Sequence, residues 1–301
     1  MLILLGVAAA ILTALLAGII ALEAVRPPRR AAGYALARGL PLDPAELSLP
    51  FTSWTVRCHD GVELPVWDID LSADRRTPAG PRPSPPLTLV LLHGWGRSRI
   101  ESLARLAALR AAAPGAFDCA LLVDLRGHGE STASFSRLGS GEEGDLLELL
   151  RMAAAPRVLL AGHSMGGVTA ILAAASDDPV TATIAGVIAW APYHDVHVPI
   201  CLRLRAREFP ARPFTDIALA GLRLLGIRTR STEAFAAQLR VPLLVLQGDA
   251  DPLSPSAGAK RIAEAAPKGR FILLPGVTHG DAHETAAAEH AAAVKSFVDS
   301  I

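Results

Sequence analysis

The chain has 301 residues, of which 51% are hydrophobic, so it can bury the core of one large domain or two small ones. Its 29 basic residues balance 29 acidic residues, and the resulting formal net charge of zero gives no basis for nucleic-acid binding. The three cysteines are widely spaced and form no CxxC pair, so the composition predicts neither a disulfide scaffold nor a metal site.

Residues 1–22, MLILLGVAAAILTALLAGIIAL, contain no charged side chain. As a helix they would extend about 30 Å, which is the thickness of the hydrocarbon core of a bilayer. A cleavable signal peptide is the alternative, but it would call for a basic residue before the apolar run and a small-x-small cleavage site. The segment matches neither requirement, and the sequence therefore predicts a single-pass transmembrane helix.

Arg26, Arg29 and Arg30 follow the apolar run directly. Because basic residues favour the cytoplasmic side of a membrane, we expect the N-terminus outside and the rest of the chain in the cytoplasm. The abundance of Ala, Gly, Pro and Arg suggests a bacterial gene, so the membrane would be the bacterial inner membrane. Residues 23–50 are expected to form a juxtamembrane connector with some helical character.

The segment 51–69 alternates polar and apolar residues around Asp60-Gly61, a strong signal for an N-terminal β-hairpin. The proline-rich segment 72–86 is predicted to be a surface loop. Short apolar runs then alternate with segments of helical length, and we expect strands at 87–92, 118–123, 157–161, 184–190, 241–247 and 270–275. This pattern predicts an α/β fold with a mostly parallel central sheet and helices on both faces.

The interval of about 193–240 breaks this alternation. It is long, rich in arginine and helical in character, and we expect it to form a small helical cap inserted into a domain that spans residues 51–301. The arginines between 202 and 212 are expected on the solvated or membrane-facing surface of this cap, with binding of an acidic substrate as the alternative.

A candidate nucleophile lies in the stretch AGHSMGGV, residues 161–168, between an apolar run and an alanine-rich one. In a strand–turn–helix of the G-x-S-x-G type, Ser164 adopts a strained backbone that projects its hydroxyl, and Gly162 and Gly166 avoid crowding. Ligands bind at the carboxyl ends of the strands in an open parallel sheet, which is where Ser164 is expected. A plain turn residue is the alternative interpretation.

Four other motifs follow predicted strands: LLHGWGRSR, DLRGHGES, LLVLQGDADPLSP and ILLPGVTHGDAHE. Together with the serine turn they resemble the α/β-hydrolase superfamily, in the chain order of that family and over about residues 51–301. The resemblance points to its serine hydrolases, either the esterase and lipase branch or the serine aminopeptidase branch. It also implies that the turn at 124–131, with Asp124, Arg126 and His128, has a structural role.

The resemblance implies a catalytic triad of Ser164, Asp251 and His279. Asp251 is preferred to Asp249 because the Gly-x-x-Asp spacing starts at Gly248, and His279 is preferred to His283. Backbone N–H groups of Trp95 and Met165 would form the oxyanion hole.

The predicted function is a membrane-anchored serine hydrolase that cleaves carboxylic esters of small molecules, thioesters and lipid-like acyl esters included, through an acyl-enzyme. No metal or organic cofactor is implied, and the oligomeric state stays open. A serine aminopeptidase is the alternative, and it would need an acidic subsite for which the cap offers Glu208, Asp216 and Glu233. A non-catalytic binding protein is less favoured, since no member of the triad is missing.

Overall fold

The computed structural model describes residues 1–72, 87–280 and 282–301. Within these ranges, eight strands form one sheet in the order β1-β2-β4-β3-β5-β6-β7-β8. The strands are β1 Phe51–Arg57, β2 Glu63–Asp70, β3 Leu87–Leu92, β4 Phe117–Val123, β5 Val158–His163, β6 Ile184–Trp190, β7 Leu243–Gly248 and β8 Gly269–Leu274. The loop predicted at 72–86 lies outside the described residues from residue 73 on.

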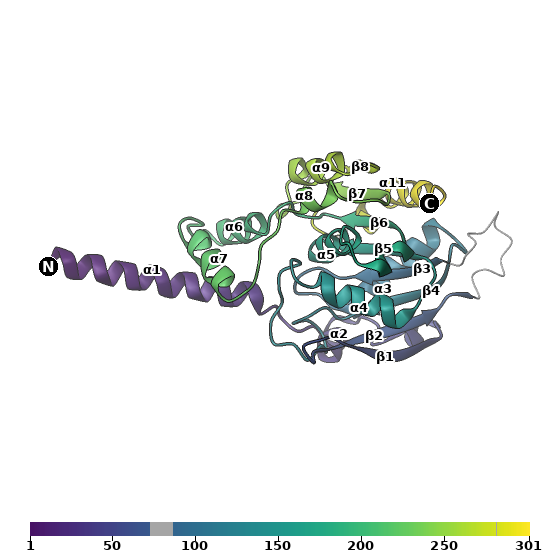
Figure 1. Ribbon diagram of the computed structural model, residues 1–301, viewed down its shortest axis with the longest axis horizontal. Coiled ribbons are helices and arrows are strands. Elements are labelled where there is room, and N and C mark those ends of the chain that lie inside the picture. Colours follow the sequence, from purple (N-terminus) through teal and green to yellow (C-terminus); the bar gives the residue numbers. More distant parts are fainter. Residues whose placement is uncertain (73–86, 281) are drawn as a thin grey trace.

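The sheet is antiparallel from β1 through β2 to β4 and parallel from β4 to β8 (Figure 1). The hairpin between β1 and β2 turns at Gly61, whose φ of 80° is readily adopted by glycine alone. The predicted N-terminal hairpin, the mostly parallel sheet and the α/β class are therefore confirmed. Each of the six predicted parallel strands is present, with ends shifted by no more than two residues.

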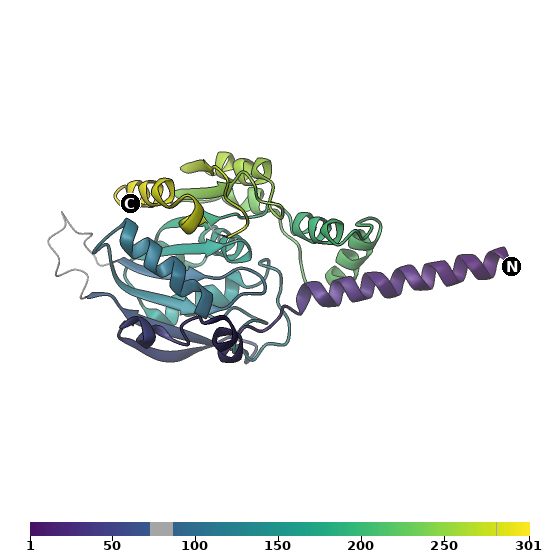
Figure 2. The same ribbon diagram turned by 180° about the vertical axis from the view of Figure 1, so that it is seen from behind.

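Helices cover both faces of the sheet (Figures 1 and 2). On one face α3, Arg99–Ala112, and α11, Ala287–Val298, bury residues such as Leu106 and Phe297. On the other face α4, Glu143–Ala153, α5, Met165–Ala174, and α9, Ser256–Ala265, bury residues such as Ile171. The remaining short helices are α2 Ala32–Arg38, η1 Pro44–Leu47, η3 Pro179–Thr183 and α10 Ala282–Thr285. Because the strands are covered on both sides, their apolar runs are continuous.

We call the helical segment between β6 and β7 the cap. It contains α6, His197–Ala206, α7, Phe214–Leu224, and α8, Thr232–Ala236. Helix α8 packs against α5 and α9, whereas α6 and α7 stand away from the sheet (Figure 1). The cap therefore covers the edge where the parallel strands end.

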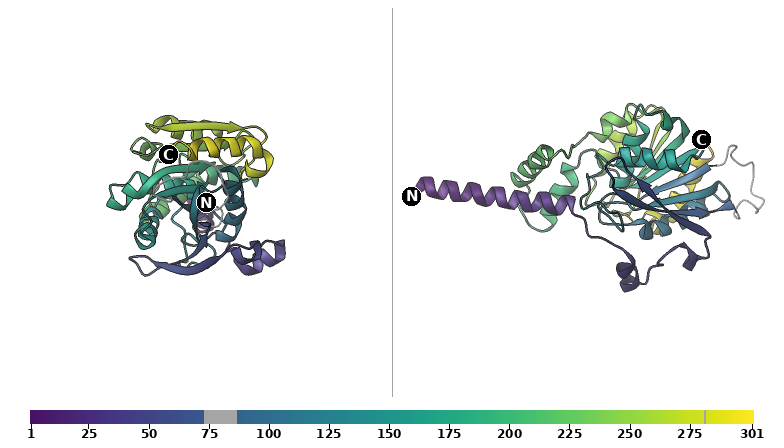
Figure 3. Two further views of the ribbon diagram at one scale, coloured as in Figure 1. Left: turned by 90° about the vertical axis from the view of Figure 1, so that its right-hand side faces the viewer. Right: turned by 60° about the horizontal axis from the view of Figure 1, so that its bottom comes forward.

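The N-terminal helix α1 runs from Leu2 to Val25, three residues beyond the predicted end. Among the described helices, it is the one long and apolar enough to cross a membrane, with a mean hydropathy of 2.7. It extends away from the domain, and α7 lies beside its C-terminal half (Figures 1 and 3). There Ala17 and Ile20 share a small buried cluster with residues of α6 and α7, so the helix is joined to the cap.

The segment after α1 is packed on the domain. Val25 is buried in the main core, and its carbonyl accepts a hydrogen bond from the backbone N–H of Ser136 at 2.8 Å. Arg29 donates to the carbonyl oxygens of Ser131 and Ala133. These contacts fix the direction in which α1 leaves the domain.

Candidate active site

Ser164 lies in the sharp turn between the end of β5 and the start of α5. Its φ of 51° and ψ of −112° are strained for a residue with a side chain. The glycines on either side explain how the turn closes: a Cβ on Gly166 would lie 2.5 Å from the carbonyl oxygen of Leu92, and one on Gly162 would overlap the backbone of Gly166. The local sequence thus folds as the G-x-S-x-G pattern predicts.

His279 and Asp251 meet at Ser164 although they come from different loops. His279 follows β8, and its Nε2 lies 3.1 Å from the Ser164 Oγ. The Nδ1 of the same ring lies 2.7 Å from Oδ2 of Asp251, which follows β7. These loops meet because parallel strands end at the same edge of the sheet. In this geometry a carboxylate orients an imidazole, and the imidazole can accept the proton of the hydroxyl.

The alternative acid and base lie elsewhere. The exposed Asp249 accepts a hydrogen bond from the backbone N–H of Gly276 at 2.7 Å, which closes the turn after β8. His283 lies on α10, with its ring 6.4 Å from that of His290. The structure therefore brings to Ser164 the two residues that the family spacing selects.

Asp251 is held by several donors. Although burial opposes ionisation, hydrogen bonds and the proximity of His279 lower the pKa of Asp251. The backbone N–H groups of Leu253 and Ser254 donate to Oδ1 at 2.8 and 2.9 Å, and the side-chain amide of Gln247 donates to Oδ2 at 3.0 Å. The sequence analysis missed Gln247. Its only signal is a polar residue near the end of the apolar strand LLVLQG.

The loop after β3 carries Trp95 and is anchored by a neutral histidine. His93 donates from Nδ1 to the carbonyl of Gly94 at 2.9 Å and accepts at Nε2 from the N–H of Leu125 at 3.0 Å. Burial keeps the pKa of His93 well below its usual value, which favours this uncharged form. Trp95 in this loop lines the same pocket as Ser164, and Met165 follows Ser164 directly as the first residue of α5. The oxyanion hole that their backbone N–H groups would form stays a prediction.

The turn DLRGHGES, residues 124–131, is held by buried hydrogen bonds and ion pairs. The carboxylate of Asp124 accepts the backbone N–H of Arg99 at 2.8 Å and that of Glu130 at 3.0 Å. Arg126 donates twice to Asp145, at 2.7 and 2.8 Å. The bond to Glu130 closes the turn itself, and the bonds to Arg99 and Asp145 tie it to α3 and α4, which agrees with the expected structural role.

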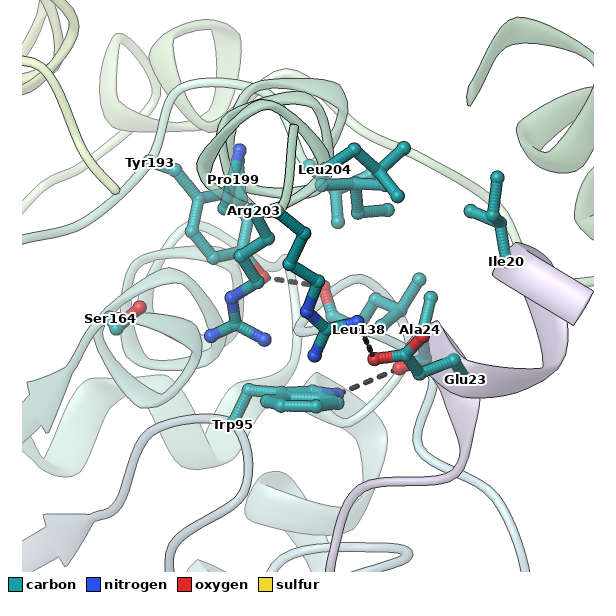
Figure 4. Close-up of a pocket in the computed structure, with 13 residues that line it drawn as sticks. Ile20, Glu23, Ala24, Trp95, Leu138, Ser164, Tyr193, Pro199, Arg203 and Leu204 are labelled. Carbon is teal, nitrogen blue, oxygen red and sulfur yellow. Dashed lines mark hydrogen bonds and ion pairs between the residues drawn. The ribbon is translucent and has the colours of Figure 1, made fainter. Parts of the chain in front are cut away.

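A pocket opens beside Ser164, under α6 of the cap (Figure 4). Its lining is mostly apolar and comes from α1, the loop after β3, the loop before α4 and the cap. The lining residues are Ile20, Glu23, Ala24, Trp95, Leu138, Ser164, Tyr193, Val196, Pro199, Ile200, Arg203, Leu204 and Arg207. The three residues from α1 and the inward-facing Arg203 were not expected from the sequence. Arg205, one of the arginines predicted on the surface of the cap, is exposed.

Two contacts join α1 to the catalytic side of this pocket. The indole N–H of Trp95 donates to the carbonyl of Ala24 at 2.7 Å. Glu23 forms an ion pair with Arg207 of the cap at 2.5 Å. In the described part of the chain, no three His, Cys, Asp or Glu side chains are grouped so that they could hold a metal ion.

The comparisons with known proteins point to one family. The sequence model of the alpha/beta hydrolase family matches residues 89–293. No curated protein matches the sequence. Among solved structures, the Pyrococcus furiosus esterase Pf2001 is similar with a TM-score of 0.69 and 19% identity, over 92% of this chain and 99% of that one.

Two other esterase structures show the same likeness. The esterase RhEst1 from Rhodococcus sp. ECU1013 has a TM-score of 0.57 and 20% identity, over 84% of this chain and 99% of its own. A thermophilic esterase from Thermogutta terrifontis has a TM-score of 0.56 and 21% identity, over 83% of this chain and 98% of its own. At these identities the likeness concerns the fold.

Proposed function

Because the chain belongs to the alpha/beta hydrolase family, we propose that it is a serine hydrolase that cleaves carboxylic esters through an acyl-enzyme. One observation carries the proposal: the continuous hydrogen-bonded series from Asp251 through His279 to Ser164, at 2.7 and 3.1 Å. The esterase names of the similar structures support the same reaction.

The proposed reaction starts with attack of the Ser164 Oγ on the ester carbonyl carbon while His279 takes the hydroxyl proton. The negative charge that develops on the carbonyl oxygen is held by the backbone N–H groups of Trp95 and Met165. His279 then returns the proton to the leaving alcohol, and water releases the acid from Ser164 by the same steps. Asp251 keeps the tautomer of His279 and stabilises its charged form.

The contacts of the cap favour an ester over a peptide substrate. An aminopeptidase would need a free carboxylate in the pocket for the amine of the substrate. Among the described residues, Asp216 is bound to His197 at 2.9 Å and Glu233 is paired with Arg261 at 3.2 Å, and neither lines the pocket. Glu208, the third acidic residue considered, is also absent from the described lining. Glu23 does line the pocket, but it is paired with Arg207.

Hydrolysis assays on the full chain test this proposal. We expect wild-type protein to cleave p-nitrophenyl esters and to leave aminoacyl-anilides intact. Ser164→Ala should lower kcat by about 10⁴-fold or more while circular dichroism stays unchanged. Faster cleavage of the anilides would establish the peptidase. A folded wild type that cleaves neither substrate would favour a binding protein.

We also propose that α1 crosses the bacterial inner membrane with the hydrolase domain in the cytoplasm. The exposed apolar surface of α1 supports the crossing, and the arginines that follow α1 support the orientation. A green fluorescent protein fused to the C-terminus should fluoresce, and alkaline phosphatase fused there should be inactive. Active phosphatase would place the domain outside the cytoplasm.

A further inference from the structure

The pocket beside Ser164 has one wall that belongs to the N-terminal helix. Ile20, Glu23 and Ala24 lie on the last turns of α1 and face the same cavity as Ser164 (Figure 4). The hydrogen bond from the Trp95 indole to Ala24 ties this wall to the loop of the proposed oxyanion hole. The segment that would hold the protein in the membrane is therefore also part of the substrate pocket.

The charges in this pocket do not balance. Glu23 is engaged by Arg207, which leaves Arg203 as a second cation on the same wall. Across the described residues, Arg203 forms no ion pair or hydrogen bond at contact distance, and its guanidinium carbon lies over the face of the Trp95 ring, 4.1 Å from the ring centroid. Burial lowers the pKa of Arg203, and the nearby charge of Glu23 opposes this shift without cancelling it.

The stacking of Arg203 on Trp95 prepares it for an anion. The face of the Trp95 ring contacts the face of the guanidinium group. The N–H donors of a guanidinium lie around its edge, so this stacking leaves them free to bind an anion. Such an edge suits two oxygens of a carboxylate or phosphate. The neighbouring lining residues Ile200 and Leu204 are apolar, so a bound anion would meet few competing water molecules there.

The surroundings of the pocket place it at the membrane surface. Helix α7 packs along α1, and Leu224 and Leu225 at its C-terminal end are 90% and 80% exposed. Exposed leucines beside an apolar helix that is itself exposed form a surface suited to lipid. A substrate dissolved in the bilayer would reach the wall formed by Ile20 without crossing water.

We infer that Arg203 binds an anionic group of the substrate, and that the substrate is an amphiphilic ester drawn from the membrane that holds α1. This inference rests on the proposed function. The ester carbonyl would lie at Ser164, the carboxylate or phosphate at Arg203, and apolar parts against Ile20, Ile200 and Leu204.

A pair of lipids that differ only in charge tests the role of Arg203. Full-length protein in phosphatidylcholine vesicles is given either 1-oleoyl-glycerol 3-phosphate or 1-oleoyl-glycerol, and released oleate is measured. Wild type should prefer the phosphate in kcat/KM by about tenfold to hundredfold, the effect of a hydrogen-bonded charge pair. Arg203→Met should abolish this preference, and Arg203→Lys should retain part of it. Arg205→Met, on the exposed side of α6, should behave as wild type.

The same assay contains the results that would overturn the inference. An equal loss on both lipids in Arg203→Met would show a structural role, and a wild type without preference would show that no anion is recognised. Equal kcat/KM on water-soluble 1-butanoyl-glycerol 3-phosphate would contradict the membrane source.

Two variants of α1 test its part in the pocket. Ile20→Trp should lower oleate release because the larger side chain would occupy part of the pocket. Ile19→Trp, on the exposed side of α1, should not lower it. Equal rates in both variants would contradict the role of α1. Labelling of Ser164 by a fluorophosphonate, run beside each assay, separates failure of this inference from failure of the proposed function.

Discussion

Asp249 and Asp251 are two residues apart and have different surroundings. The Asp251 side chain is fully buried, accepts backbone and amide N–H groups, and lies 2.7 Å from Nδ1 of His279. Asp249 is exposed and closes a turn. A buried carboxylate with several donors stays charged and fixed in place, which is what an imidazole that gains a proton requires.

We therefore expect the two aspartates to respond differently to the same substitution. Asp251→Asn should lower kcat on p-nitrophenyl esters by about 10³–10⁴-fold, because the amide cannot hold His279 in the required tautomer. Asp249→Asn is the matched control and should change kcat less than about threefold, since it touches no reacting group. A large loss in Asp249→Asn with an active Asp251→Asn would reverse the assignment.

The residues that could be predicted at this scale are those within short motifs. Ser164, Asp251 and His279 each lie in a short motif after a strand, so the resemblance of these motifs to the family was enough to propose them. Gln247 and Arg203 could not be found in this way. Gln247 matters through its bond to Asp251, and Arg203 through the ring of Trp95, which is more than 100 residues away in the chain.

At the scale of elements, the turn between β5 and α5 depends on contact with β3. The Cα of Gly166 faces the carbonyl of Leu92 at the end of β3, so α5 can begin here only without a side chain at this position. Backbone oxygen cannot move aside as a flexible side chain can. The position of Ser164 is therefore set by the packing of three elements.

Gly166→Ala should destabilise the protein, because its methyl group would lie 2.5 Å from the Leu92 carbonyl oxygen. We expect a loss of about 2 kcal/mol or more, seen as a melting temperature lower by about 5 °C or more. Gly144→Ala is the matched control: Gly144 is exposed on α4 with open space around it, and alanine there should stabilise by about 0.5–1 kcal/mol. An unchanged melting temperature in Gly166→Ala would mean that the turn can relax.

The parallel strands could be predicted because each is buried on both faces of the sheet. Such a strand is a short continuous apolar run, which can be recognised in the sequence. The position of α1 against the cap could not be predicted from the sequence. Its composition predicts a helix for a membrane, but Ala17 and Ile20 look like any other apolar residues of that helix. Their contact with the cap depends on the direction in which Val25 and Arg29 fix the chain, which is a tertiary property.

At the scale of the whole molecule, four histidines are buried on several elements. Burial lowers the pKa of His128 and His290 to about 4 and that of His93 and His163 well below the usual value. A folded-state pKa below the unfolded one means that the unfolded chain binds more protons, so stability falls as pH decreases from 6.5 towards 4. Glu142 and Asp124 act in the opposite sense, since burial raises the pKa of Glu142 to about 7 and also raises that of Asp124, and the four histidines outnumber these two groups.

The melting temperature of the detergent-solubilised protein should therefore fall between pH 7 and pH 4. In His290→Gln, whose amide oxygen can still accept the indole N–H of Trp190, this fall should be smaller by on the order of 5 °C. His59→Gln changes an exposed histidine and is the control, with the same fall as wild type. Identical curves for all three proteins would show that His290 is not held neutral.

We propose that Ser164 is the nucleophile of a hydrolase that α1 holds at a membrane. Membranes from cells that express the full chain can be treated with a fluorophosphonate probe, washed, and examined by mass spectrometry of the labelled peptides. We expect one adduct on this chain in the membrane fraction, on Ser164, which is lost in Ser164→Ala and strongly reduced in His279→Ala. A folded wild type that stays unlabelled, or that carries its adduct on another serine, would contradict it.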